Sequence, residues 1–123
     1  IRVSLFVEAD PEQLRAAADA GAAVVELHSG AYCDASAGER PALLRRLQDA
    51  AALTAKLGLE CHIGHGLTFD TVGPVAAIPE AVELNIGHFL IGEAIFTGLG
   101  PAIRRMRAER DAGRGLAESK AGR

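Results

Sequence analysis

The chain has 123 residues, of which 49% are hydrophobic and 24% are charged, a composition typical of a compact globular domain rather than a disordered segment. Its net charge of −3 argues against a nucleic-acid surface, which would need a concentrated basic face. No apolar run is long enough to span a bilayer, so we expect no membrane contact.

Residues 2–8 form the first predicted strand, because they are a short run rich in β-branched and aromatic side chains. A helix should follow at once, with Asp10 as its N-cap and Pro11 at its first position. Residues 22–28, which are mostly apolar, form the second predicted strand.

A polar loop separates the second strand from an amphipathic helix that should end at Gly58. Two starts for this helix are open. Ser36 and Glu39 have the spacing of a capping box, whereas Pro41 would mark the first helical turn instead. Residues 59–64 form the third predicted strand.

The last part of the chain is predicted to hold one more strand, over residues 82–87. A short helix over about residues 70–78 should precede it, interrupted near Gly73 and Pro74. An apolar helical stretch follows the strand, and the last helix should cover about residues 101–110.

The alternation of strands and helices predicts one parallel α/β domain over residues 1–111. Nearly continuous apolar strands suit a sheet that is covered on both faces or closed into a barrel, and they do not separate a small open sheet from half a barrel. Residues 112–123 lack periodicity and are expected to form a mobile tail. The chain starts at Ile1, without Met and inside a predicted strand, so we expect a truncated, cleaved or incompletely observed chain.

The two cysteines, Cys33 and Cys61, provide neither a disulfide framework nor metal-ligand spacing. This usage, with no segment that resembles a signal peptide, favours a reducing cytoplasmic setting. Neither cysteine has a neighbour that would lower its pKa, so both are expected to be structural.

Two glycine-containing loops mark the candidate site, because ligands in α/β folds meet the C-terminal ends of the strands. The third strand runs into GHGLT, residues 64–68, and the fourth into NIGH, residues 85–88, which opens an extra short helix. Glycines let an anion approach the backbone, and helix N-terminal N–H groups attract negative charge. The arrangement predicts a phosphate site, and the alternative is that the glycines only form tight turns.

Candidate acid–base groups lie on the same strands and loops. Glu26 interrupts an apolar strand, with His28 on the same face, and should contact substrate unless it forms a structural salt bridge. His65 lies between two glycines and suits general acid catalysis, whereas His88 suits phosphate binding. His62 should be a packed or edge side chain rather than a ligand. Glu26, His65 and His88 would be an alternative metal site, which no short metal motif supports.

The segments VSLFVEAD, VVELHSGAY, GHGLT and AAIPEAVELNIGHFLIGEAIFTGL occur in this order. With them the chain resembles the pyridoxine 5′-phosphate synthase family over about residues 2–110. The resemblance implies the C-terminal half, strands five to eight, of a (β/α)8 TIM barrel. It also implies condensation of 1-deoxy-D-xylulose 5-phosphate with 3-amino-2-oxopropyl phosphate to pyridoxine 5′-phosphate, phosphate and water. The resemblance implies no metal or organic cofactor. It does imply that the protein forms a homo-oligomer.

The resemblance also implies roles for five residues. His65 matches the family's proton donor and acceptor, and Glu26 matches the carboxylate that stabilises a transition state. Gly66 matches a backbone contact to the phosphate of the amino ketone. Gly87 and His88 match the pair that holds the same phosphate.

The family's first four strands, which carry its remaining catalytic groups, have no counterpart in this sequence. We therefore expect the chain alone to be inactive and its partner to be the N-terminal half of the same barrel. One rival interpretation is another phosphate-binding TIM-barrel enzyme. A second is a non-catalytic phosphate-binding half-barrel that pairs with its own copies, and a third is an α/β fragment without any anion site.

Overall fold

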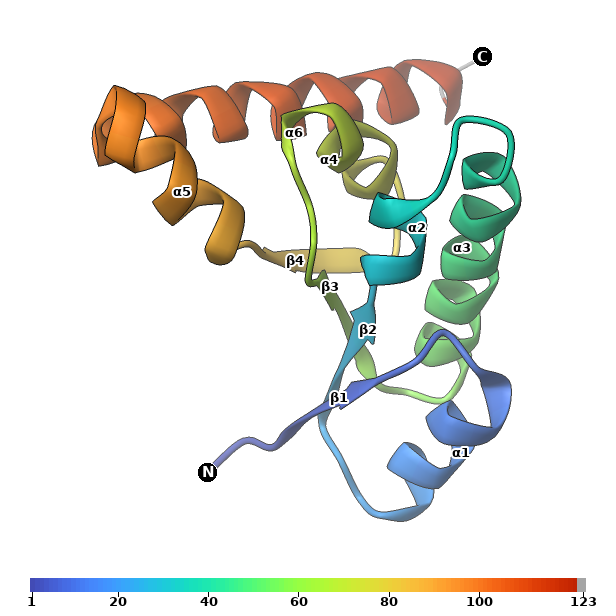
Figure 1. Cartoon of the computed structure of the whole chain (residues 1–123). Helices are drawn as coiled ribbons and strands as arrows, with labels where there is room; N and C mark the ends of the chain where they lie inside the picture. The colour runs from blue at the N-terminus through green and yellow to red at the C-terminus, as the bar shows by residue number, and fades with distance from the viewer. Residues whose placement is uncertain (122–123) are drawn as a thin grey trace.

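The computed structural model describes residues 1–121 and contains a four-stranded parallel sheet in the order β1-β2-β3-β4 (Figure 1). In chain order the elements are β1 (Ser4–Val7), α1 (Pro11–Asp19), β2 (Val24–His28), α2 (Gly30–Asp34), α3 (Arg40–Lys56), β3 (Glu60–Gly64), α4 (Phe69–Ala76), β4 (Ala81–Asn85), α5 (His88–Thr97) and α6 (Leu99–Ala121). This confirms the predicted parallel α/β architecture, which is compatible with half of a TIM barrel.

The two faces of the sheet differ. Alternate strand residues such as Val25, Leu27 and Ile63 point toward the helices and are fully buried there. The residues between them point the other way, and they form a row across the sheet in the register Phe6, Glu26, His62, Glu83. In the described residues no element covers this second face, and Phe6 is 56% exposed on it. We call it the open face.

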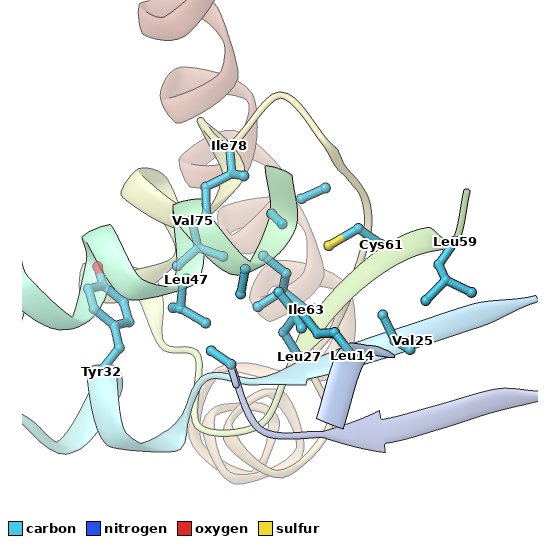
Figure 2. Close-up of a cluster of buried hydrophobic side chains, with 14 of the residues drawn as sticks. Leu14, Val25, Leu27, Tyr32, Leu47, Leu59, Cys61, Ile63, Val75 and Ile78 are labelled. Carbon is cyan, nitrogen blue, oxygen red and sulfur yellow. The ribbon is translucent and has the colours of Figure 1, made fainter. Parts of the chain in front are cut away.

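The core lies between the covered face and the helices (Figure 2). Leu14 of α1, Leu47 of α3 and Val75 of α4 meet the strand side chains there. Thr54 is the buried polar residue of the α3 stripe, and its hydroxyl donates to the carbonyl oxygen of Ala50 at 2.8 Å. The predicted amphipathic helix is therefore confirmed.

Both predicted helix starts can be judged from their hydrogen bonds. The Asp10 carboxylate accepts from the N–H of Glu12 at 2.8 Å, with Pro11 in the first position, as predicted. Helix α3 begins at Arg40 with Pro41 in its first turn, so the proline marks its start. Ser36 instead donates to Glu39 at 2.6 Å within the preceding turn.

Three predictions of secondary structure are wrong. The loop after β2 contains the short helix α2, and α4 continues through Gly73 and Pro74 without interruption. Helix α6 runs to Ala121, beyond the expected end near residue 110 and through most of the segment assigned to a tail; residues 122–123 lie outside the described residues.

Close packing explains the length of α6. Gly113 lies against the backbone of Gly73, where a Cβ would not fit, so this part of α6 touches α4 through a glycine. Earlier in α6, Met106 packs with Phe69 and Val72 of α4. Arg114 then donates to the carbonyl oxygens of Ile78 at 3.0 Å and Ala81 at 2.6 Å. A periodicity search cannot detect a helix that is held by a glycine contact and an arginine.

No helix within residues 1–121 has the length and apolarity needed to cross a bilayer.

Candidate functional site

The loops after β3 and β4 line a hollow of about 780 Å³ at the C-terminal end of the sheet. The five residues predicted for the site all line it: Glu26, His65, Gly66, Gly87 and His88. They come from three strand ends, which are adjacent because β2, β3 and β4 are parallel neighbours. The structure therefore brings together side chains that are far apart in the chain.

Glu26 is held by a residue that the sequence interpretation missed. Its Oε2 accepts a hydrogen bond from Nδ2 of Asn85 at 2.8 Å. The two side chains meet across Gly64, which lies on the strand between them; a Cβ there would collide with Oε1 of Glu26 and would lie 2.9 Å from the Asn85 carbonyl oxygen. A glycine inside a strand often marks such a close approach, and this was the available signal.

His65 has an unusual backbone. Its φ is 75°, and Gly66 follows with φ 84°. The left-handed region costs a non-glycine residue roughly 1–3 kcal/mol and is often found at functional sites. The positive φ values reverse the chain after β3 and leave both residues exposed at the hollow.

The ring of His65 lies among other aromatic rings. Its centroid is 4.7 Å from that of His28 and 6.3 Å from that of Phe6. His28, on the same face as Glu26 as predicted, is itself oriented by Glu8, whose carboxylate lies 2.7 Å from Nδ1 of His28. The wall beside His65 is thus built from β1 and β2, and it leaves the imidazole open to the hollow.

The start of α5 supplies backbone donors on the opposite wall. Gly87 is the N-cap, and no side chain caps the helix there. Helix α4 differs, because Thr68 and Thr71 form a capping box at its N-terminus. Phe89 packs edge-on against Phe69 at a centroid distance of 4.8 Å, which fixes the first turn of α5 against α4. The N–H groups at the start of α5, beside His88, can therefore bind an anion in the hollow.

The remaining histidine and the cysteines take no part in the hollow. His62 lies between two carboxylates, 2.8 Å from Glu60 and 3.4 Å from Glu83, which confirms it as a packed side chain. Burial raises the pKa of the Cys61 thiol to about 12 and also raises the pKa of Cys33. Both thiols are free, and neither is activated. Within residues 1–121 no three His, Cys, Asp or Glu side chains are arranged to hold a metal ion.

Comparison with known proteins adds a second line of evidence. The family model described as "Pyridoxal phosphate biosynthesis protein PdxJ" matches residues 1–112. The chain is 62% identical over 117 residues to the pyridoxine 5′-phosphate synthase of Caulobacter sp. (strain K31), an alignment that covers 92% of this chain and 47% of that protein. It is 66% identical over 113 residues to the protein of the same name from Rhodospirillum rubrum, covering 91% of this chain and 45% of the relative. The chain thus spans about half the length of the curated relatives it matches.

Proposed function

The chain belongs to the pyridoxal phosphate biosynthesis protein PdxJ family, and from this we propose that it carries one half of the active site of a pyridoxine 5′-phosphate synthase. The observation that carries the proposal is the meeting of Glu26, His65, Gly66, Gly87 and His88 around one hollow. We further propose that the four strands are the C-terminal half of a (β/α)8 barrel. In such barrels the active site lies at the C-terminal ends of the strands, where this hollow is.

The proposed reaction condenses 1-deoxy-D-xylulose 5-phosphate with 3-amino-2-oxopropyl phosphate and releases inorganic phosphate and water. We assign the phosphate of the amino ketone to the start of α5, where the N–H groups beside Gly87 and His88 are uncapped. The exposed Gly66, across the hollow, leaves its backbone accessible to the same group. Helix N-termini and glycine backbones bind anions without needing a basic side chain.

Proton transfer is assigned to His65. Ring closure needs protons to be added and removed in several steps, and an imidazole is the side chain best suited to this near neutral pH. His65 projects from a tight turn into the hollow and does not belong to the core. It is therefore free to meet a substrate held by the α5 terminus.

Glu26 is assigned to the stabilisation of positive charge that develops on the amino group during condensation. The amide of Asn85 donates to one carboxylate oxygen, so the side chain is held in place by a neutral partner. A fixed charge aimed at the reacting centre stabilises a transition state with little reorganisation.

The open face supports the N-terminal half of the same barrel as the partner. Phe6 is 56% exposed on it, and the strands β1 and β4 are the edges of the sheet within residues 1–121. Closing a barrel would cover this face and pair both edges. The apolar residues Ile91, Ile95 and Phe96 of α5, exposed by 60%, 78% and 86%, support a homo-oligomer. Free thiols and phosphorylated substrates suit the cytoplasm.

The test is turnover by a completed barrel. This chain would replace the matching C-terminal part of the Caulobacter vibrioides relative, to which it is 64% identical over 117 residues. We expect the chimera to form pyridoxine 5′-phosphate from the two substrates and the isolated chain to form none. A non-catalytic half-barrel would bind phosphate in the chimera without turnover, and a different barrel enzyme would reject this substrate pair.

A further inference from the structure

We propose that Ser29 is a positioning residue that holds His65 in the conformation in which its imidazole reaches the hollow. The inference rests on the proposed function, because it explains how the proton-transfer residue of that same site is oriented. Ser29 follows β2 directly, does not line the hollow, and is fully buried.

The backbone at His65 needs support from outside the loop. Among residues 1–121, His65 is the non-glycine residue with a positive φ, 75°. This conformation is disfavoured for any residue that has a Cβ, and it persists where surrounding groups enforce it. An unsupported loop would relax toward negative φ, and the imidazole would leave its place.

Ser29 provides that support through hydrogen bonds to two successive carbonyl groups. Its N–H donates to the carbonyl oxygen of Gly64 at 2.9 Å. Its Oγ lies 2.6 Å from the same oxygen and 2.8 Å from the carbonyl oxygen of His65. A hydroxyl carries one proton. A carbonyl oxygen can accept two hydrogen bonds, so this proton can go to Gly64 or to His65. Both oxygens belong to the peptide groups that flank His65, so either hydrogen bond restrains its backbone.

The other donor near the carbonyl oxygen of His65 is weak. Sγ of Cys33 lies 3.8 Å from the oxygen of His65, and a thiol is a poor hydrogen-bond donor. Cys33 therefore offers a matched control, because its removal takes away a contact to the same oxygen without taking away the strong donor.

The ring of His65 is fixed at its other end. A Cβ on Gly30, the residue after Ser29, would lie 2.8 Å from Nε2 of His28 and 3.2 Å from Cδ2 of His65, so both rings rest directly on the first turn of α2. The segment from His28 to Gly30 thus seats the ring, and Ser29 fixes the peptide group that carries it.

The test compares four variants of the chimera with the Caulobacter vibrioides relative. We expect Ser29→Ala to lower kcat by about 10- to 100-fold, because misplacement of a catalytic group by about 1 Å costs up to about 10²-fold. The KM values should change less than about 3-fold, since substrate binding is assigned to other groups. Ser29→Thr keeps the hydroxyl and should restore kcat to within about 3-fold, and Cys33→Ala should change it less than about 2-fold.

Two results would overturn the inference: a folded Ser29→Ala protein with an unchanged kcat, or a folded Ser29→Thr protein as slow as Ser29→Ala. If Ser29→Ala does not fold, Ser29→Cys decides the question, because its weak donor should give a clear loss of kcat and full activity would contradict the role. The backbone ¹³C chemical shifts of His65 provide a readout without turnover. They should leave the left-handed range in Ser29→Ala alone. Absence of product from the unsubstituted protein would mean failure of the proposed function, and these shifts would still decide the role of Ser29.

Discussion

Glu26 and Asn85 are joined by a hydrogen bond of 2.8 Å that crosses β3 over the backbone of Gly64. Three adjacent strands thus contribute to one contact. β2 supplies the carboxylate, β4 supplies the amide, and β3 has a glycine between them, which leaves room for the two side chains to meet. The contact fixes Glu26, the carboxylate that lines the hollow in the described part of the chain, and it ties β2 to β4, which are not hydrogen-bonded neighbours in the sheet.

Replacement of Gly64 by alanine should break this contact. The new Cβ would collide with Glu26 and crowd the backbone oxygen of Asn85, which cannot move without shifting β4. Insertion of a methyl group into a packed site costs about 1–3 kcal/mol, and we expect urea unfolding to show a loss of that size. Gly38→Ala is the matched control, since nothing lies within 4 Å of its added Cβ. Equal stability of the two variants would contradict the close approach.

Replacement of Glu26 by glutamine separates the catalytic role from a structural one. The glutamine side chain would have nearly the same shape without the charge. If the carboxylate stabilises charge in the transition state, kcat should fall by about 10²–10³-fold while the free energy of unfolding changes little. A variant that loses stability but keeps its kcat would show that Glu26 is only a structural partner of Asn85.

The close contact of α4 and α6 is also testable. Gly113→Ala places a methyl group into the backbone of Gly73, and we expect a loss of at least about 1 kcal/mol in the free energy of unfolding. Gly115→Ala, two residues on in the same helix, has open space around its Cβ and should stabilise by about 0.5–1 kcal/mol through helix propensity. Urea unfolding of the two variants checks the opposite signs, and a stabilised Gly113→Ala would refute the contact.

Acid should remove the contribution that Glu60 makes to the free energy of unfolding. Its pKa is lowered first by the hydrogen bond from Arg2 and then by that from His62. A carboxyl group with a lowered folded-state pKa binds fewer protons than in the unfolded chain, so its contribution is present above the unfolded pKa and is lost as the pH falls through the folded one. Arg2→Ala should therefore be less stable than the parent at neutral pH, and the difference should shrink below about pH 4.

Unfolding curves across this pH range measure the difference directly. Arg110→Ala is the control, because Arg110 pairs with the adjacent residue Asp111, a contact that the unfolded chain can also make. A difference between Arg2→Ala and the parent that stays constant down to about pH 3 would contradict the assignment.

The sequence predicted the strands and the site loops because their signals are local. Apolar runs, the Asp10–Pro11 helix start and the two glycine loops each lie within a few residues, and the parallel topology then places the loops side by side. The resemblance to a family added roles for Glu26 and His65, which remain proposals.

The sequence did not show which tertiary contacts hold Glu26 and His65 in place. Asn85 lies 59 residues from Glu26, and Ser29 lies 36 residues from His65; such pairings arise only when strands align in register. The end of α6 was missed for a similar reason, because Gly113 and Gly73 stabilise it through a contact between helices. Tertiary contacts without a local pattern are the part that single-sequence analysis cannot supply.

The most direct test of the central claim is the turnover of the completed chimera with and without His65. We expect the chimera of this chain with the N-terminal part of the Caulobacter vibrioides relative to form pyridoxine 5′-phosphate, and we expect His65→Ala to reduce its kcat by at least about 10²-fold. His62→Ala removes a histidine outside the hollow, and a folded His62→Ala chimera should have the same kcat as the unsubstituted chimera. A folded chimera without product, or one whose rate is the same after His65→Ala, would contradict the assignment of this hollow as half of the synthase active site.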